Sequence, residues 1–246
     1  MKSRQKVRKL LLVIMFLFLP VVMFYFSPYL IIRGAAEGIV TGSVIMFASQ
    51  FVFSLFFGRF FCGYVCPTGG LQECLMLANC KKAKGGKRNL IKYFIWTPWI
   101  AVIAILFVRA GGFTRFDFTF HVANGVSLAE PFTYFIYYGV VLIIVVLSLT
   151  AGSRATCHYI CWMAPFMVIG TKLADRLKIP RLHLESEKDS CIGCMKCSEK
   201  CPMSLDVKVM VETEKMKNPE CILCGECIDI CPKKTIKYAF KSGPKG

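Results

Sequence analysis

Residues 191–202 read CIGCMKCSEKCP, and residues 221–232 read CILCGECIDICP. Both stretches have the spacing C-x2-C-x2-C-x3-C-P, so eight of the 14 cysteines in this chain of 246 residues fall into two identical patterns. Two-residue gaps let three thiolates surround one multi-iron cluster, and the proline turns the chain away because it has a fixed φ and no N–H. Zinc sites or disulfides are the alternative, but zinc ligands come as two separated pairs, and neither explains a run of four that ends in Cys-Pro twice.

The pattern resembles that of bacterial ferredoxins with two 4Fe-4S clusters, in which the fourth cysteine of each run ligates the other cluster. The resemblance implies a crossed ligand set, with cluster one held by Cys191, Cys194, Cys197 and Cys231 and cluster two by Cys221, Cys224, Cys227 and Cys201. It also implies a pseudo-symmetric α+β domain over residues 181–246, with a helix and a turn in residues 203–220. Because cluster cysteines must stay reduced until they bind iron, we expect this domain in the cytoplasm.

The composition indicates a membrane protein. Hydrophobic residues make up 55% of the chain, which exceeds the usual share in soluble domains. The net charge of +16 is unevenly distributed, since residues 1–180 carry 19 Lys and Arg against 5 Asp and Glu, whereas residues 181–246 carry 12 against 10. The basic residues flank apolar runs, so they fit the positive-inside pattern of membrane proteins and give no support for nucleic-acid binding.

Residues 1–180 are predicted to form a membrane domain with four spans. The predicted spans cover about residues 10–32, 38–58, 90–108 and 131–153. The first has 23 uncharged residues, enough to cross the hydrocarbon core as one helix, with Pro20 and Pro28 predicted to bend it. A cleaved signal peptide is the alternative for this segment, but its apolar region would be only about 7 to 15 residues long.

The flanking charges predict the orientation of the spans. The N-terminal tail has five Lys and Arg and residues 59–92 have seven, whereas the two other connections have one and two. The positive-inside rule therefore predicts a multi-pass protein of the cell inner membrane with both termini in the cytoplasm.

An internal repeat marks the ends of the second and fourth predicted spans. Residues 59–66 read RFFCGYVC and residues 154–161 read RATCHYIC, so both follow R-x-x-C-x-Y-x-C and close two similar helical hairpins. On a helix, cysteines four residues apart share a face. We therefore hypothesise a further metal or iron–sulfur site formed by Cys62, Cys66, Cys157 and Cys161. The alternative is that these four residues are small buried hydrophobes, as free cysteines often are.

Together, the spans, the C-x3-C motifs and the double-cluster run resemble the NapH-type membrane ferredoxins, which are related to the membrane parts of NosR-type and PceC-type proteins. In that family proline usually follows the C-x3-C motif, which Cys66-Pro67 matches and Cys161-Trp162 does not. The resemblance implies electron transfer between membrane quinol and redox partner proteins of the cytoplasm, membrane or extracytoplasmic space. It also implies that the chain is a subunit of a larger complex, such as a quinol dehydrogenase.

Other residues and cofactors receive less support. His158 is the best candidate for proton exchange with a quinone, because the pKa of an unperturbed histidine lies near neutrality. The alternative, which we favour, is that it is only a polar residue at the membrane interface. Haem is not expected, since C-x2-C-H is absent and the three histidines provide no pair on facing spans. No nucleotide is expected, because the chain lacks GxGxxG and P-loop motifs. Cys74 and Cys80 are interpreted as packing residues.

The leading functional prediction is a membrane-bound iron–sulfur protein that relays electrons between the quinone pool and redox partners. The alternative is a membrane redox sensor or a metal-centre assembly factor, whose clusters report or donate instead of conducting. A transporter is a third reading, which the scarcity of acidic residues within the spans disfavours.

Overall fold

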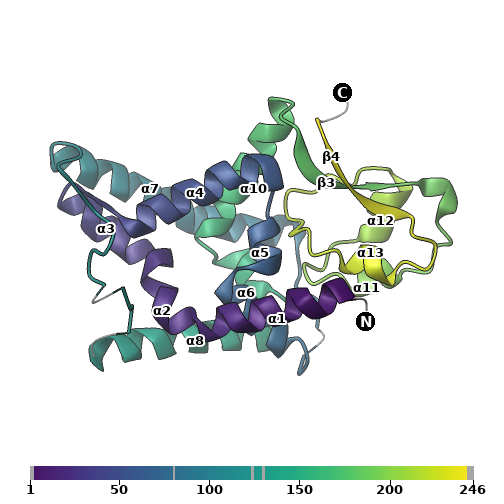
Figure 1. The fold of residues 1–246 in the computed structure, drawn as a ribbon, viewed down its shortest axis with the longest axis horizontal. Helices are drawn as coiled ribbons and strands as arrows, with labels where there is room; N and C mark the ends of the chain where they lie inside the picture. The colour runs from purple at the N-terminus through teal and green to yellow at the C-terminus, as the bar shows by residue number, and fades with distance from the viewer. Residues whose placement is uncertain (1–2, 80, 123–124, 129–130, 243–246) are drawn as a thin grey trace.

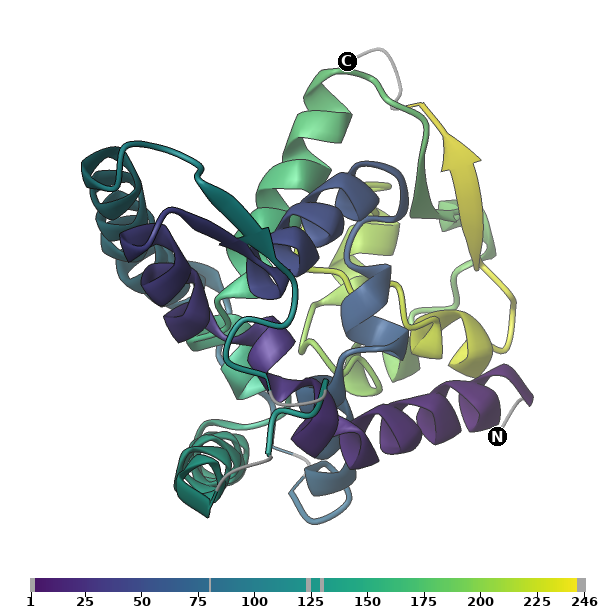
Figure 2. The ribbon, with the colours of Figure 1, turned by 60° about the vertical axis from the view of Figure 1, so that its left-hand side comes forward.

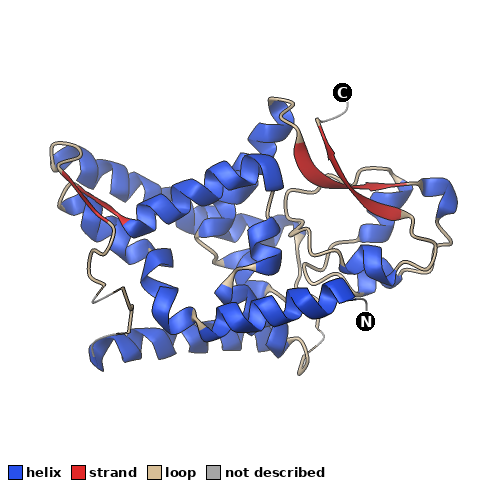
Figure 3. Ribbon diagram, viewed as in Figure 1, coloured by secondary structure: helices blue, strands red, loops and turns tan. Residues whose placement is uncertain are grey.

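The computed structural model describes residues 3–79, 81–122, 125–128 and 131–242, which are mainly helical (Figures 1 and 3). The first part of the chain contains α1 (Ser3–Leu17), α2 (Leu19–Val22), η1 (Met23–Phe26), α3 (Pro28–Ala36), β1 (Ile39–Thr41), α4 (Gly42–Phe57), α5 (Phe60–Tyr64), α6 (Pro67–Leu75), η2 (Gly86–Leu90), α7 (Ile91–Arg109), β2 (Arg115–Asp117), α8 (Pro131–Ala151), α9 (Ala155–Tyr159) and α10 (Met163–Arg176). The second part contains β3 (Arg181–Ser186), η3 (Lys188–Ser190), α11 (Lys196–Glu199), α12 (Val207–Glu212), α13 (Glu226–Ile230) and β4 (Ile236–Lys241).

The first predicted span is not a single helix. Residues 10–32 are divided among α1, α2, η1 and α3, and the axis bends by 56° between α1 and the segment that follows it. Both prolines lie in the first turn of a new helix, where a missing N–H costs nothing. The hydroxyl of Ser27 caps α3 by accepting a hydrogen bond from the backbone N–H of Leu30. The prolines therefore divide this segment as well as bend it.

Within the described part of the chain, two helices are long and apolar enough to cross a membrane. They are the 24-residue helix over Gly86–Arg109 and the 21-residue α8. The bent pair of α1 with the segment up to Phe26 could form a third crossing, whereas the apolar helix α4 has only 16 residues. The side chain of Thr41 caps α4, and Gly58 ends it with a φ of +53°, a conformation that favours glycine.

Two further helices, α6 and α10, follow the cysteine motifs. Helix α6 packs on α1, and Gly70 lies so close that a Cβ there would clash with the Leu12 carbonyl oxygen. Helix α10 packs on α4 in the same manner, with Gly170 against the side chain of Ser54. Each half of the repeat therefore contains a long helix, a short helix that carries the motif, and a packed helix after it.

The second part of the chain forms an α+β domain at one end of the molecule (right in Figure 1). Strands β3 and β4 pair antiparallel, with Arg181 opposite Lys241 and Ser186 opposite Ile236. The domain has its own apolar core of Leu184, Val207, Val211, Met216, Leu223, Cys227 and Ile236. The beginning of α1 lies beside α13 in both views (Figures 1 and 2). The N-terminal end of the chain therefore packs on this domain.

Candidate functional site

The eight cysteines of the two runs line two separate cavities. One cavity is lined by Cys201, Cys221, Cys224 and Cys227, together with apolar residues such as Met203 and Ile222. The other is lined by Cys191, Cys194, Cys197 and Cys231. Each cavity thus receives three cysteines from one run and the fourth from the other run, which is the crossed grouping that the sequence analysis expects. The donor set fits a 4Fe-4S cluster in each cavity.

The loops that carry the first three cysteines of each run share one backbone conformation. Gly193 and Leu223, at equivalent positions, have φ values of +69° and +53°. Met195 and Gly225, also equivalent, have φ values of +61° and +74°. Left-handed residues among ordinary ones turn successive N–H groups toward one point and so favour a bound anion such as a thiolate-ligated cluster. The loops therefore supply amide donors as well as thiols.

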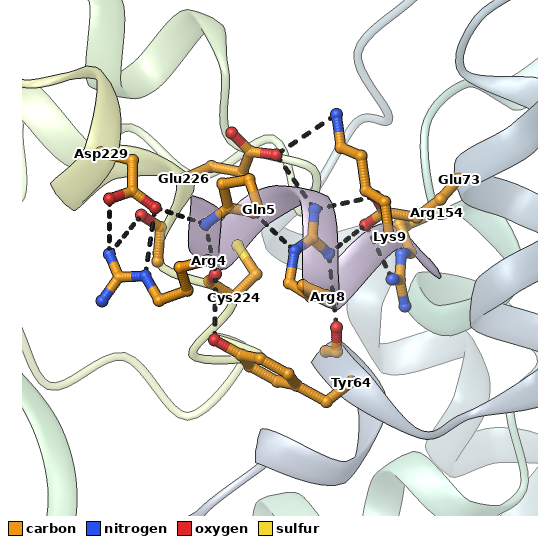
Figure 4. A network of polar contacts seen from close by, with 12 residues as sticks. Arg4, Gln5, Arg8, Lys9, Tyr64, Glu73, Arg154, Cys224, Glu226 and Asp229 are labelled. Carbon is orange, nitrogen blue, oxygen red and sulfur yellow. Dashed lines mark hydrogen bonds and ion pairs between the residues drawn. The ribbon is translucent and has the colours of Figure 1, made fainter. Parts of the chain in front are cut away.

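The two cavities differ in their surroundings. In the cluster-two cavity, Cys224 and Cys227 are buried, whereas Cys194 of the cluster-one cavity is exposed. Two groups from the first part of the chain reach the carbonyl oxygen of Cys224, the amide of Gln5 at 3.0 Å and the hydroxyl of Tyr64 at 3.5 Å (Figure 4). The cluster-two cavity therefore lies against α1 and α5, and the cluster-one cavity lies away from them.

The C-x3-C motifs are corners between two helices, so the expectation of a single helix face for each pair is wrong. Cys62 lies within α5, but Cys66 follows the end of that helix and has an extended backbone as the N-cap of α6. Cys157 and Cys161 are similarly divided, since α9 ends at Tyr159 and α10 begins at Met163. The physical reason in the first motif is Pro67, because a proline disfavours the helical conformation of the residue before it.

The four cysteines of the two C-x3-C motifs lie in two adjoining apolar clusters. We call them the membrane cysteines: Cys62, Cys66, Cys157 and Cys161. Cys62 and Cys157 pack with Cys224 of the cluster-two cavity, while Cys66 packs with Cys161. Burial, followed by the charges of Cys157, Cys62 and Cys66, raises the pKa of Cys161. The structure thus places these four cysteines as two pairs in neighbouring clusters, with Cys62 and Cys157 on the side of cluster two. Among the described residues, no three His, Cys, Asp or Glu side chains are grouped closely enough to hold one metal ion.

A buried ionic network joins the first motif to the cluster-two loop (Figure 4). Arg8, whose side chain is fully buried, donates to both carboxylate oxygens of Glu73 at 2.9 Å and to Glu226 of α13 at 3.0 Å. Arg154 shares Glu73 at 2.8 Å and donates to the carbonyl oxygen of Cys62 at 2.7 Å. Burial alone raises the pKa of Glu73, but the charges of Arg154 and Arg8 and their hydrogen bonds outweigh it and lower that pKa to about 2.

A second network joins the same regions through Glu220. Its carboxylate pairs with the buried guanidinium of Arg59 and with the ammonium of Lys92 at 2.6 Å. Burial raises the pKa of Glu220, but the charges of Arg59 and Lys92 outweigh this effect and lower it. Sequence reasoning missed Glu73 and Glu220. The one signal for Glu73 is the scarcity of acidic residues, five in residues 1–180.

His158, the candidate for proton exchange, lies between the two parts of the chain and contacts both. Its ring nitrogens contact the side-chain oxygen of Asn89 at 2.7 Å and the carbonyl oxygen of Met203 at 3.1 Å. Burial, followed by the positive charge of Arg59, lowers its pKa to about 4, so the ring is neutral near pH 7. Cys74 is half-buried, and Cys80 lies outside the described residues.

An apolar cavity of about 260 Å³ adjoins the membrane cysteines. Its walls come from α2, η1, α8 and the two motif corners, and Cys161 is part of them. The polar side chains in the lining are the hydroxyls of Ser27, Thr68 and Thr156 beside the thiol of Cys161. Such a cavity suits a lipophilic ligand with a few polar atoms.

Comparisons with known proteins agree with this arrangement. A family described as a 4Fe-4S binding domain matches residues 39–83 and 132–180, which contain both C-x3-C motifs, and a family described as a 4Fe-4S dicluster domain matches residues 183–232. An uncharacterized protein of Methanocaldococcus jannaschii is 24% identical over 88% of this chain and 81% of its own length. No solved structure matches the chain.

Two relatives have names that describe a role. The ferredoxin-type protein NapH of Haemophilus influenzae is 26% identical over 76% of this chain and 64% of its own length. A putative electron transport protein of Escherichia coli is 22% identical over 83% of this chain and 57% of its own length. The fold and the cysteine sites define a ferredoxin-type iron–sulfur protein with helices that could cross a membrane. Within this class, the chain is similar to the ferredoxin-type NapH proteins over most of its length.

Proposed function

We propose that the protein relays electrons between the membrane quinone pool and redox partner proteins, as the quinol-dehydrogenase-type subunit of a larger complex. When bound at the two cysteine sets, 4Fe-4S clusters supply two one-electron carriers. The observation that carries the proposal is the difference in burial between the two cavities. One is enclosed by elements of the membrane part, and the other has the exposed Cys194. An electron relay needs one cluster close to the membrane part and one cluster close to the surface, where a partner protein can approach.

The chain's own residues favour transfer between the membrane part and the cluster-two cavity. Cys224 shares an apolar cluster with Cys62 and Cys157, which excludes water between them. The hydroxyl of Tyr64 and the amide of Gln5 hold the Cys224 carbonyl from the membrane side. These contacts fix the distance between the two parts, and a fixed short distance is what electron transfer requires from the protein.

The apolar cavity beside Cys161 is the candidate quinone site. Its aliphatic and aromatic walls suit the isoprenoid tail and the ring, and the hydroxyls of Thr68 and Thr156 can donate to the quinone oxygens. His158 is not among the residues that line this cavity. We therefore favour the threonine hydroxyls over His158 as the groups that orient the quinone.

The proposed orientation places both termini in the cytoplasm at the inner membrane. The ionic contact of Arg4 with Asp229 at 2.9 Å keeps the beginning of α1 beside the ferredoxin domain, so both lie on one side. The positive-inside rule assigns that side to the cytoplasm. A reporter fused after residue 246 and another inserted in residues 81–88 should then both read cytoplasmic, and one inserted at residue 112 should read external. The opposite pattern would exclude this orientation.

The functional test is reduction of the clusters by a lipophilic quinol in proteoliposomes. Val140 lines the cavity, so Val140→Trp should fill it and slow quinol-dependent reduction by about tenfold or more, while dithionite still reduces the clusters. Leu142→Trp is the matched control, because Leu142 is 61% exposed on the same helix and is not among the cavity residues. If quinol fails to reduce the wild-type clusters and oxidant releases them, the protein is a sensor or an assembly factor.

A further inference from the structure

The loops that carry the first three cysteines of each run share a backbone conformation but differ in what covers them. We call them the cluster-one loop, residues 191–197, and the cluster-two loop, residues 221–227. Ile222 is 1% exposed and α5 packs against its carbonyl group, whereas the equivalent Ile192 is 58% exposed. A Cβ added at Gly193 would meet no atom beyond its chain neighbours within 4 Å. Within the described part of the chain, the cluster-one loop is therefore uncovered.

The two loops also carry opposite charges at equivalent positions. Glu226 of the cluster-two loop pairs with Arg8 at 3.0 Å and with Lys9 at 3.6 Å. The covered loop is thus acidic at this position, and the helix that covers it, α1, is basic. At the position of Glu226, the cluster-one loop has Lys196. By the pseudo-symmetry of the two runs, a cover for the cluster-one loop has to be acidic.

Further lysines surround the uncovered loop. Residues 188–201 and 231–234 contain five lysines and two acidic residues, all of them exposed, which gives this surface a net charge of +3. Lys208 and Lys233 are the charged residues in the lining of the cluster-one cavity, whereas Glu226 is the charged residue in the lining of the cluster-two cavity. A bound cluster adds negative charge below this surface, where N–H groups of the loop face it. The lysine ammonium groups therefore set the charge that an approaching protein meets.

The centre of this surface is apolar. Ile192 and Met195 are exposed on either side of Cys194. Met195 has a φ of +61°, a conformation that favours glycine, and the cluster-two loop has Gly225 at the equivalent position. A large side chain is thus present where the backbone alone favours none. An apolar centre that includes methionine, with a charged rim, is typical of surfaces that bind proteins.

We propose that the cluster-one loop and the lysines around it form the docking surface for a redox partner protein with an acidic surface. The partner covers this loop as α1 covers the cluster-two loop, with the charges exchanged. Its acidic groups pair with Lys196, Lys200, Lys233 and Lys234, and an apolar patch on it covers Ile192 and Met195. A second copy of the chain would bring lysines against lysines, which disfavours it as the occupant. The inference rests on the proposed function in taking cluster one as the terminal for the partner.

An anionic lipid surface has the same charge as an acidic protein, but the location favours the protein. Strand β3 runs toward the end of the molecule far from α7 and α8, and η3 and the cluster-one loop follow it (Figure 1). The surface therefore lies away from the two long apolar helices, where a partner in solution can reach it. Interfaces between electron-transfer proteins are small, and electrostatic steering raises their association rates.

The test is electron transfer to two soluble acceptors of opposite charge. The full-length protein with its clusters, in a neutral detergent, is reduced with dithionite and freed of excess reductant. It is then mixed with oxidised flavodoxin, an acidic protein, or with oxidised cytochrome c, a basic one, and one electron passes to the flavin or to the haem. Raising the salt from about 0.01 M to about 0.15 M shortens the Debye length from about 30 Å to about 8 Å.

With this increase in salt, reduction of flavodoxin should slow by about tenfold, whereas reduction of cytochrome c should not slow. A flavodoxin rate that stays constant or rises with salt would overturn the proposal. Because dithionite supplies the electrons, the result does not depend on the quinone site. Failure of quinol to reduce the clusters would therefore count against the proposed function but not against this surface.

Lys196→Glu tests the surface itself. At low salt this variant should reduce flavodoxin about fivefold more slowly and cytochrome c faster than the wild-type protein. Lys215→Glu is the matched control, because it makes the same charge change at an exposed residue of the same domain that lines a different groove. Equal effects of the two variants would mean that only net charge matters, and the docking surface would be disproved. The salt dependence of the wild-type protein stands even if a variant fails to bind its clusters.

Vesicles of phosphatidylglycerol separate the lipid alternative from a partner protein. The protein in nanodiscs of neutral lipid should not bind these vesicles at about 0.15 M salt, where charges beyond about 8 Å are screened. Binding that is lost in Lys196→Glu, together with a flavodoxin rate that does not depend on salt, would assign the surface to anionic lipid and overturn the proposal.

Discussion

The two ferredoxin cavities have the same ligand spacing and the same pair of left-handed loop positions, yet their surroundings differ. Cys224 of the cluster-two cavity is 7% exposed and is contacted from α1 and α5, whereas Cys194 of the cluster-one cavity is exposed. A cysteine motif therefore specifies a ligand set but not its environment. The environment comes from contacts across the chain, and these contacts distinguish a site packed against α1 and α5 from a site that is partly exposed.

The largest difference between the two cavities is expected when the fourth cysteine ligand of each cluster is replaced. Cys201→Ser should remove the cluster whose other ligands are Cys221, Cys224 and Cys227, with a loss of about four iron atoms per chain. Cys231→Ser should remove the other cluster by the same amount. Electron paramagnetic resonance of each variant identifies the signal that remains. Loss of the same signal in both variants, or an exchange of the two, would disprove the crossed connectivity.

The next effect concerns α1, the helix that lies against the cluster-two cavity but not against the cluster-one cavity. Arg8→Gln breaks a buried ionic network on Glu73 and Glu226, so we expect a destabilisation of about 3 kcal/mol. This corresponds to a fall of about 6–12 °C in the midpoint of thermal cluster loss. The cluster-two signal should be lost first, because its cavity lies against α1.

Arg4→Gln is the matched control for this prediction. Arg4 lies one turn earlier on the same helix and pairs with Asp229, but its side chain is 34% exposed. Solvent screening limits such a pair to about 1 kcal/mol or less, so the midpoint should fall by only a few degrees. If the midpoint fell equally in the two variants, the buried network would not stabilise the packing of the ferredoxin domain on α1.

Local patterns predicted the ferredoxin part of the site. Its cysteine ligands lie in two short runs, residues 191–202 and 221–232, and each run carries its own turn residues. The networks around Glu73 and Glu220 were not predictable, because Arg8 and Glu73 are separated by 65 positions and Arg59 and Glu220 by 161. No periodicity encodes such distant pairs. The scarcity of acidic residues before residue 180 is the one cue in the sequence.

The membrane part was predicted at the level of apolar segments but not of helices. Hydropathy located the segments that became α4, α7 and α8, and it cannot show that residues 10–32 are divided at two prolines. The helix-face interpretation of the C-x3-C motif ignored Pro67, which keeps Cys66 out of the helical conformation. Helix α10 was missed because it is stabilised by packing on a distant helix, which local propensity does not report.

The smallest effect tests how closely the first motif approaches cluster two. A Cβ added at Gly63 would clash with the carbonyl oxygen of Ile222, within the cluster-two loop. Gly63→Ala should therefore displace that loop, cost about 1–3 kcal/mol and change the line shape of the cluster-two signal but not of the cluster-one signal. Gly139→Ala in α8 is the control, since a Cβ there has open space and alanine favours a helix. If both alanine variants left both signals unchanged, α5 would not be in close contact with the cluster-two loop.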